Sequence, residues 1–270
     1  MSKRDRWSAL LELLAAEGRL EVEEAAGALD VSSATIRRDL DELAEQQMLV
    51  RTRGGAVAHG VSYELPLRYK MSRRAPEKQR IAAAAADLIG DGEVVGLNGG
   101  TTTTEVARVL ALRVGGSRRD GAEAGAPVAS SPALTVVTNA LNIAAELAVR
   151  PQVKIVSTGG VARPQSYELV GPLTGGVLKE VVLDAAVLGV DGIDPQLGIM
   201  AHHEDEAGVS RLFTERANRV IVVTDSSKLG KRAFARICDL DRVDTLVTDV
   251  NISPESSARL TEAGVKVIAV

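Results

Sequence analysis

Apolar side chains in the first fifty residues recur at steps of three and four, the spacing that gathers them on one face of an α-helix. Three such stripes follow one another along the chain. Their members are Trp7, Leu10, Leu11 and Leu14 in the first, Val22, Ala25, Ala26 and Leu29 in the second, and Ile36, Leu40 and Leu43 in the third. Ser32 or Ser33 can cap the third helix by accepting a hydrogen bond from a free backbone N–H. The pattern predicts three short helices that share a core.

The polar face of the third predicted helix carries Thr35, Arg37 and Arg38. An amphipathic helix of this kind can enter the major groove of DNA, where arginine reaches guanine edges or phosphates. A short basic β-wing follows, which contains Arg51 and Arg53. Three helices and a wing make a winged helix-turn-helix domain, and its polar face indicates DNA as the partner.

Arg37 and Arg38 also have a simpler interpretation, a solvated helix face that pairs with Asp41 and Glu42 at helical spacing. Net charge does not decide between the two, because acidic residues outnumber basic ones in this part of the chain. Position favours DNA, since basic residues gather in the wing and before the first helix. The latter are Lys3, Arg4 and Arg6. A second basic run comprises Arg68, Lys70, Arg73, Arg74, Lys78 and Arg80, and we interpret most of it as a solvated linker.

Beyond residue 75 the pattern changes to an alternation of helical segments and short apolar runs. A helix is predicted over residues 76–89. Apolar runs typical of buried strands follow at residues 94–97, 134–137, 153–156, 185–190, 220–223, 245–247 and 265–270. The alternation predicts an α/β fold with a doubly wound, mainly parallel sheet and ligands at the carboxyl ends of its strands. Residues 113–132 have a polar, glycine-rich composition that buries little apolar surface, so we expect a mobile loop there.

Composition narrows the class of protein. The 270 residues are 45% hydrophobic with a net charge of −4, which suits two domains with separate cores. No segment resembles a signal peptide or a membrane span, and the single cysteine, Cys238, excludes an internal disulfide. We therefore expect a cytoplasmic protein. An aromatic content of 2% argues against an RNA-binding sheet that stacks bases on exposed rings. A non-specific, architectural DNA binder would be strongly basic, whereas this chain is acidic.

Polar motifs follow several of the predicted strands. In the first, residues 98–104, glycines and threonines open a helix, so that backbone N–H groups and hydroxyls converge where a phosphate fits. The others are Thr138-Asn139, Thr158-Gly159-Gly160, residues 189–192 and residues 224–228. A parallel sheet brings them to one edge, where they offer hydroxyls, amides, a carboxylate and a cation. That set suits a phosphorylated polyol, with Lys228 on the phosphate and Asp191 and Asn139 on hydroxyls.

The N-terminal segment resembles the DNA-binding domain of DeoR-family bacterial transcription regulators, whose sequences show a similar Ser-x-x-Thr-Ile-Arg-Arg-Asp-Leu and a wing ending in Gly-Gly-Ala. The chain departs from that pattern at Gln47, where the family commonly has glycine, and at Arg53, where it commonly has histidine. A left-handed Gln47 would cost roughly 1 kcal/mol relative to glycine, so we expect a slightly different turn. We expect the DNA contacts to come from Ser33, Thr35, Arg37, Arg38, Arg51 and Arg53.

Residues 76–270 resemble the sugar-phosphate-sensing domain of the same family, which is itself similar to ribose-5-phosphate isomerases. The family more often has aspartate where this chain has Asn98, and we expect that difference to alter the effector preference. The resemblance implies effector contacts from Gly100, Thr101, Thr102, Asn139, Gly160, Asp191, Asp225 and Lys228.

An isomerase-like enzyme that carries a DNA-binding domain is the alternative. Residues 191–194 resemble part of the acidic motif of the isomerases, but those enzymes continue with a lysine and a glycine tract. This chain has Ala201-His202-His203-Glu204 in the comparable region, so we expect no catalysis. The two histidines also invite a metal site. Neighbours in an extended segment point to opposite sides, and only His59 remains to complete a site. We predict no metal or other cofactor, and interpret this segment as a polar loop that starts a helix.

These observations predict a transcriptional regulator with a winged helix-turn-helix domain at residues 1–57, a linker at 58–75 and an effector domain at 76–270. One reading head offers few base contacts, so we expect a homodimer or homotetramer on repeated half-sites of double-stranded operator DNA. We expect repression of carbohydrate metabolism genes that is relieved by a phosphorylated sugar, with no membrane partner.

Overall fold

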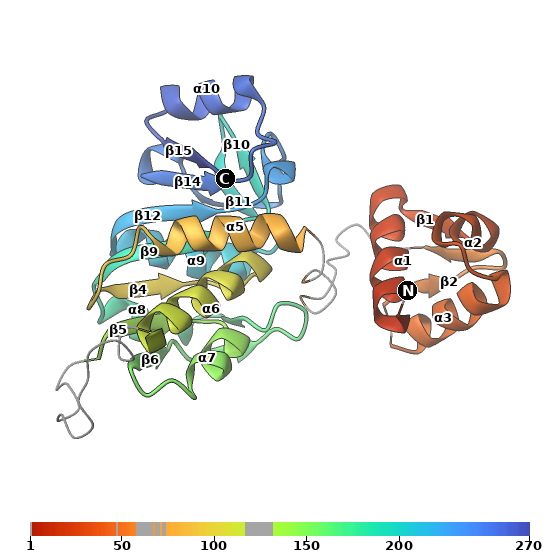
Figure 1. Ribbon diagram of the computed structural model, residues 1–270, viewed down its shortest axis with the longest axis horizontal. Helices are drawn as coiled ribbons and strands as arrows, with labels where there is room; N and C mark the ends of the chain where they lie inside the picture. The colour runs from red at the N-terminus through yellow and green to blue at the C-terminus, as the bar shows by residue number, and fades with distance from the viewer. Residues whose placement is uncertain (1, 47, 58–66, 68–70, 72–73, 117–131) are drawn as a thin grey trace. The chain divides into compact units, whose positions relative to one another are not determined.

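The computed structural model describes residues 2–46, 48–57, 67, 71, 74–116 and 132–270 (Figure 1). The chain divides into two compact units, Met1–Arg73 and Arg74–Val270, which are described separately below.

Within residues 2–46 and 48–57, the smaller unit has three helices and a three-stranded wing (Figure 1). Its elements are α1 (Lys3–Glu17), β1 (Arg19–Glu21), α2 (Val22–Leu29), α3 (Ser33–Glu45), β2 (Val50–Arg51) and β3 (Gly55–Val57). The three predicted apolar stripes meet in one core, which Met48 and Leu49 complete. This is the winged helix-turn-helix fold that the sequence predicted.

Local sequence fixes the ends of these elements. Ser32 caps α3, because its hydroxyl accepts a hydrogen bond from the N–H of Thr35 at 3.2 Å. The antiparallel sheet has the order β1-β3-β2, and β1 was not predicted. Strands β1 and β3 lie so close together that position 55 must be glycine, since a Cβ there would lie 1.7 Å from the backbone oxygen of Leu20. Helix α3 ends with Gln46 as its C-cap, and the predicted left-handed Gln47 lies outside the described residues.

The larger unit is built on a parallel sheet of seven strands in the order β15-β14-β12-β9-β4-β5-β6. All seven predicted apolar runs form its strands. They are β4 (Val94–Leu97), β5 (Leu134–Thr138), β6 (Val153–Ser157), β9 (Leu183–Gly189), β12 (Ala217–Val223), β14 (Thr245–Thr248) and β15 (Lys266–Ala269). The chain runs outward from β4 to β6, returns to β9 beside β4, and continues to the other edge. The direction therefore reverses between β4 and β9, the place where open α/β sheets bind ligands.

Helices cover both faces of this sheet (Figure 1). One face is covered by α5 (Ala75–Ala86), α6 (Thr101–Gly116) and α7 (Leu141–Leu147), and the other by α8 (Thr174–Lys179) and α9 (Glu204–Arg216), while α10 (Pro254–Glu262) packs beside β15. Helix α6 continues to Gly116, so the prediction that a loop begins at Arg113 was wrong at its start. Residues 117–131 of the predicted loop lie outside the described residues.

Smaller elements connect the strands of the large sheet. A hairpin, β7 (Val161–Ala162) and β8 (Leu169–Val170), follows β6. An antiparallel sheet combines β10 (Gly192–Asp194), β11 (Gly198–Ala201) and β13 (Ala235–Cys238), and two single turns, η1 (Ser226–Lys228) and η2 (Leu240–Arg242), complete the unit. The sequence predicted none of these elements.

Candidate functional site

The polar face of α3 and the tip of the wing carry exposed arginines. Arg38 and Arg53 make no hydrogen bond or ion pair with any of the residues that the structure describes. Arg37 is also exposed, and its guanidinium lies 3.2 Å from a carboxylate oxygen of Glu23 on α2. Ser33 donates a hydrogen bond to the same carboxylate at 2.6 Å. Within the described part of the chain, Arg38 and Arg53 are therefore available to meet phosphates or bases, whereas Arg37 is held by Glu23.

The pairing of Arg37 and Arg38 with Asp41 and Glu42 is absent from the described part of the chain. Asp41 accepts a hydrogen bond from Arg51 at 2.7 Å, and Glu42 pairs with Lys3 at 2.6 Å. Arg51 also donates to the carbonyl of Gly55. Its guanidinium therefore braces the wing against α3, a role that the sequence interpretation missed because it placed Arg51 on DNA.

Asp39 locks α1 to α3. It is 2% exposed and accepts hydrogen bonds from both Nε and Nη2 of Arg6 and, at 2.9 Å, from Nε1 of Trp7. The hydrogen bond to Asp39 raises the pKa of Arg6, although partial burial opposes the rise. Arg6 thus belongs to the interior of the fold and not to a basic arm before the first helix.

Asn98 links the ends of β4 and β9, the two strands between which the direction of the chain across the sheet reverses. Its Nδ2 donates to the carbonyl of Gly189 at 2.9 Å and to the hydroxyl of Ser210 at 3.0 Å, and its Oδ1 accepts from the N–H of Gly189 at 2.8 Å. An aspartate could not make both donations, because a carboxylate only accepts. The departure from the family pattern at this position therefore has a structural role, the joining of two strands.

The glycine-threonine loop after β4 opens α6. Gly100 has a φ of 143°, which only glycine adopts without strain. Its carbonyl accepts hydrogen bonds from the hydroxyls of Thr103 and Thr104 at 3.1 and 2.6 Å. The hydroxyls of Thr103 and Thr104 therefore already donate hydrogen bonds within the loop. The hydroxyls of Thr101 and Thr102 make no hydrogen bond among the described residues and can bind another partner.

A second group of charged side chains follows β9 and β12. Lys228 Nζ lies 3.5 Å from Asp191 Oδ1, and Asp191 Oδ2 accepts from the N–H of His202 at 3.0 Å. Asp225 caps η1 and lies 3.7 Å from the guanidinium of Arg74, the left-handed residue that precedes α5. The structure therefore pairs Asp191 with Lys228 as neighbours and adds Arg74 to the group.

The loop after β5 and the hairpin after β6 approach each other. Asn139 is fully buried and donates to the carboxylate of Glu168 at 2.8 Å and to the carbonyl of Leu169 at 3.2 Å. Gly160 packs so closely on β8 that a Cβ there would lie 2.8 Å from the carbonyl oxygen of Val170. Gly160 therefore has a packing role.

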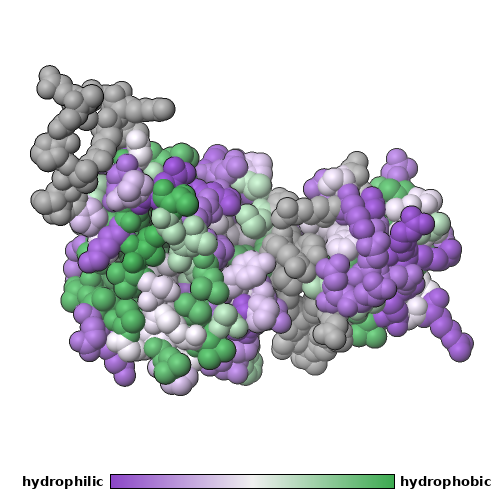
Figure 2. Space-filling model, turned by 90° about the horizontal axis from the view of Figure 1, so that it is seen from below, coloured by the Kyte–Doolittle hydropathy of each residue, from purple (hydrophilic) through white to green (hydrophobic). Residues whose placement is uncertain are grey.

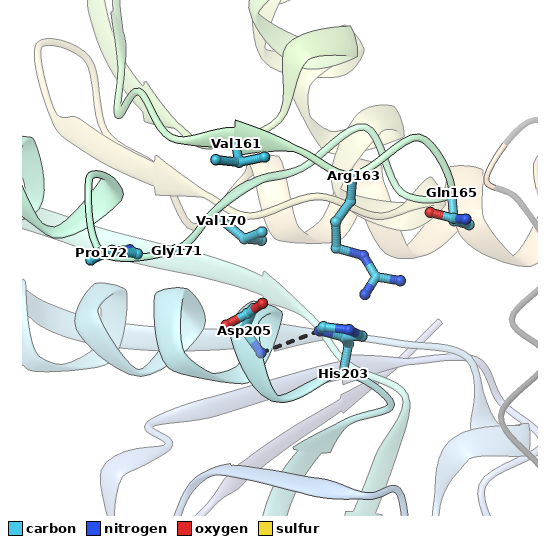
Figure 3. Close-up of a pocket in the computed structure, with 8 residues that line it drawn as sticks. All are labelled: Val161, Arg163, Gln165, Val170, Gly171, Pro172, His203 and Asp205. Atoms are coloured by element: carbon cyan, nitrogen blue, oxygen red, sulfur yellow. Dashed lines mark hydrogen bonds between the residues drawn. The ribbon is translucent and has the colours of Figure 1, made fainter.

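An open pocket of about 600 Å³ lies between this hairpin and the start of α9 (Figure 3). Arg163 points toward His203 in this view, and its Nε lies 3.1 Å from the buried Glu206. The lining residues are Val161, Arg163, Gln165, Val170, Gly171, Pro172, His203 and Asp205. None of these residues is among the predicted effector contacts. The pocket is therefore separate from the set of residues that the sequence predicted to bind the effector.

The sequence interpretation did not predict the burial of Glu168 and Lys78 in the larger unit. Glu168 is 5% exposed in a segment without a strand-end motif. Lys78 is also 5% exposed and lies on the buried side of α5, although the sequence interpretation grouped it with a basic run assigned mostly to a solvated linker. Their burial depends on contacts with distant segments, which local patterns do not reveal. Lys78 stands three, four and seven residues before Ile81, Ala82 and Ala85, which places it on the apolar face of the helix. This spacing was the available sequence signal for its burial.

Comparison with known families assigns both units. The DeoR-like helix-turn-helix domain family matches residues 6–60, and the DeoR C-terminal sensor domain family matches residues 73–114 and 124–250. The chain belongs to the DeoR family. It is a DNA-binding transcriptional regulator.

Two relatives extend over nearly the whole chain. The HTH-type transcriptional regulator GlpR of Haloferax volcanii is 33% identical and is covered over 98% of its length by 99% of this chain. The glycerol-3-phosphate regulon repressor of Escherichia coli K12 is 30% identical, with 92% of each chain covered. A solved ribose 5-phosphate isomerase A from Methanocaldococcus jannaschii is 20% identical over 56% of this chain and 53% of its own, with a TM-score of 0.39.

This DeoR regulator is not an enzyme, and Asp194 of its isomerase-like segment has a structural role. Asp194 ends β10 in a hairpin turn, where it accepts hydrogen bonds from Arg232 at 2.6 Å and from the N–H of Gln196 at 2.9 Å. The hydrogen bond from Arg232 is the main reason that the pKa of Asp194 is lowered. Burial raises the pKa of Cys238 to about 11, so its thiol is a poor nucleophile.

His203 caps α9, accepting a hydrogen bond from the N–H of Asp205 at 3.3 Å. Among the described residues no group of three histidine, cysteine, aspartate or glutamate side chains is placed to hold a metal ion. Within the same residues no helix is long and apolar enough to cross a bilayer.

Proposed function

We propose that this DeoR regulator represses genes of carbohydrate metabolism in the cytoplasm and releases its operator when a phosphorylated sugar binds the carboxyl edge of the seven-stranded sheet. The observation that carries the proposal is the gathering of hydroxyls, amides, carboxylates and one lysine at the strand ends. A relative of similar length is named for the glycerol-3-phosphate regulon, which agrees with a ligand of this chemistry.

The ligand contacts are divided by chemistry. Lys228 supplies a point charge for phosphate, and Asp191, Asp225 and Asn139 meet hydroxyl groups. Backbone N–H groups of Gly100 and Gly160 and the hydroxyls of Thr101 and Thr102 complete the proposed set, given by the motifs together with the family resemblance.

On the DNA side, Arg38 and Arg53 are the residues we expect to contact bases or phosphates, because both are exposed and lack partners among the described residues. Ser33, Thr35 and Arg37 lie on α3 with Arg38 and support the contact of that helix with DNA. Arg51 contributes mainly by holding the wing on α3. A single reading head makes few base contacts, so we propose a homodimer or homotetramer on repeated half-sites.

Selection from a library of random duplexes tests sequence-specific binding when the operator sequence is not known. We expect the full-length protein to enrich one repeated motif. The enriched duplex should bind at least about a thousandfold more tightly than a scrambled one. Enrichment of no motif, with a steep loss of affinity as salt rises, would show an architectural binder instead.

Thermal stabilisation tests the effector. Each sugar phosphate in a panel is paired with its unphosphorylated sugar, and a true ligand at a hundredfold excess over its Kd adds about 2.7 kcal/mol to the stability. Stabilisation by one phosphate ester and not by its parent sugar supports the proposal. A panel with no stabilising member, tested on protein that binds its selected duplex, would contradict the sensing function.

A further inference from the structure

Arg74 has a backbone conformation that a residue with a side chain rarely adopts. Its φ of 50° and ψ of 39° are left-handed, which crowds the Cβ of any residue other than glycine and costs energy. The residue is the N-cap of α5, yet its side chain makes no capping hydrogen bond. Capping therefore does not explain why an arginine stands at this position.

The guanidinium of Arg74 faces the carboxylate of Asp225. Nη1 of Arg74 lies 3.7 Å from Oδ1 of Asp225, and the two side chains are 35% and 11% exposed. This distance is too long for a hydrogen bond, so the two groups attract each other by charge alone. The Arg74 side chain makes no hydrogen bond among the described residues, which leaves its N–H donors available to a ligand in that part of the chain.

Asp225 keeps other hydrogen bonds when Arg74 moves away. Its Oδ1 accepts from the N–H of Ser227 at 3.1 Å and also from the hydroxyl of Ser227. An anion that draws the guanidinium away therefore does not leave the carboxylate without a donor, which is the costly outcome for a shielded polar group. The contact between Arg74 and Asp225 is one that a ligand can exchange.

The turn η1 joins this contact to the second cation of the strand edge. Asp225 is the N-cap of η1 and Lys228 is its last residue, and the N–H of Lys228 donates to the carbonyl of Asp225 at 3.1 Å. Lys228 Nζ in turn lies 3.5 Å from Asp191. One short turn therefore connects two cations, each of which lies beside a carboxylate.

A phosphate monoester matches this pair of cations. It carries up to about two negative charges at neutral pH, and it can accept two parallel hydrogen bonds from a guanidinium, whereas a lysine offers a point charge. A neutral sugar has no charge with which to compete against Asp225 for Arg74. The exchange therefore favours a phosphorylated ligand over its parent sugar.

We propose that Arg74 is a second phosphate-binding residue, which the ligand takes from Asp225. The phosphate then binds Arg74 and Lys228, and the carboxylate of Asp225 becomes available to a hydroxyl group of the same ligand. The sugar part of this inference rests on the proposed function, whereas phosphate binding by Arg74 in competition with Asp225 does not.

Titration of the full-length protein with inorganic phosphate, followed by calorimetry, tests the competition. Arg74→Gln should weaken phosphate binding at least about tenfold, because a charged donor is lost. Arg74→Gly also loses the charge but fits the left-handed backbone, so it should weaken binding equally. Asp225→Asn removes the competing charge, keeps an oxygen that can accept from Ser227, and should tighten binding at least about threefold.

The opposite signs separate a ligand contact from a purely structural ion pair. A structural pair is broken by either variant, so both would lower the melting temperature and neither would change phosphate affinity. Arg259→Gln and Glu255→Gln break an exposed pair on α10 with an N–O distance of 2.7 Å, and they serve as matched controls that should bind phosphate as the wild type does. Circular dichroism checks that each variant is folded.

Phosphate affinity that is unchanged in Arg74→Gln or in Asp225→Asn, or that changes in the same direction in both, would overturn the assignment. If the wild type binds too weakly to titrate, the comparison is made between Asp225→Asn and the double variant Arg74→Gln/Asp225→Asn. The single variant should then bind phosphate and the double variant should not, and equal behaviour of the two would overturn the assignment.

The two proposals fail separately. If no sugar phosphate stabilises the protein but the Arg74 and Asp225 variants change phosphate affinity in opposite directions, the sensing function fails and the role of Arg74 stands. If a sugar phosphate binds with equal affinity to the wild type and Arg74→Gln, only the role of Arg74 falls.

Discussion

The two candidate binding surfaces differ in how their charged side chains are paired. On the smaller unit, Arg38 and Arg53 are exposed and have no partner among the described residues, and the face shown in Figure 2 is largely hydrophilic there. At the strand edge of the larger unit, acidic side chains are shielded and paired. Asp191 pairs with Lys228, Asp225 with Arg74, and Glu168 with Asn139.

The difference separates a surface that is ready for its partner from one that must rearrange. DNA brings phosphates to Arg38 and Arg53, so binding breaks no ion pair that either arginine makes with the described residues. A ligand at the strand edge has to replace contacts that the protein makes with itself. Arg74 is the first residue of the larger unit, and its pairing with Asp225 ties the start of that unit to the edge.

The largest expected effect comes from Asp39, a buried carboxylate that holds α1 against α3. Asp39→Ala leaves Arg6 and the indole N–H of Trp7 without their acceptor and should destabilise the unit by about 3–5 kcal/mol. Trp7 is the only tryptophan, so denaturant unfolding followed by its fluorescence reports on this unit. Asp41→Ala removes an exposed partner and should cost under about 1 kcal/mol. Equal losses of unfolding free energy in the two variants would contradict the role of Asp39 in holding α1 against α3.

Arg38→Ala tests the unpaired side of the comparison. It should weaken binding to the selected duplex by about 1–3 kcal/mol per half-site, because a base or phosphate contact is lost. Folding and ligand stabilisation should not change, since this side chain has no partner among the described residues. Arg19→Ala, an exposed arginine on β1, is the control for lost charge. The affinity for the selected duplex is measured by fluorescence anisotropy. An affinity of Arg38→Ala equal to that of the wild type would show that Arg38 does not contact the DNA.

Lys228→Met tests the paired side. Loss of the cation should weaken binding of the stabilising sugar phosphate at least about tenfold, because a charged hydrogen bond is worth about 1.5–3 kcal/mol. The parent sugar should show no such change. Lys266→Met, an exposed lysine on β15, is the control. Thermal stabilisation that is equal in the wild type and Lys228→Met would place the phosphate elsewhere.

The smallest expected effect concerns Asp249, which holds the segment that carries Lys228. Burial alone would raise its pKa, but hydrogen bonds from Ser226 and Asn251 outweigh burial and lower it. Its carboxylate therefore stabilises the fold above the unfolded pKa of about 3.9, and this contribution is lost as pH falls through the lower folded value. Asp249→Asn should melt earlier than the wild type at pH 7, and the gap should narrow below about pH 4. A gap that stays constant down to pH 2 would show that the charge of Asp249 is not responsible.

Periodicity was enough to predict the scaffold. The stripes through Leu10, Val22 and Ile36 and the seven apolar runs depend on nearest neighbours along the chain, and all of them form the predicted elements. Glu168 and Lys78 could not be recognised in this way, because each is buried by segments far away in sequence. The roles of Asp39 and Arg51 were missed for the same reason. A charged side chain on a helix or wing gives no local sign of whether its partner is the protein itself or DNA.

The central claim is that a ligand at the strand edge releases the DNA held by the reading head. The most direct test adds each phosphorylated sugar and its parent sugar to the complex of the full-length protein with its selected duplex, followed by fluorescence anisotropy. We predict release by one phosphorylated sugar and no release by its parent. The Lys228→Met complex should form with normal affinity and should need at least about a tenfold higher concentration of the phosphorylated sugar for release. Release of the wild type and the variant by the same concentration, or no release by any phosphorylated sugar, would contradict the account.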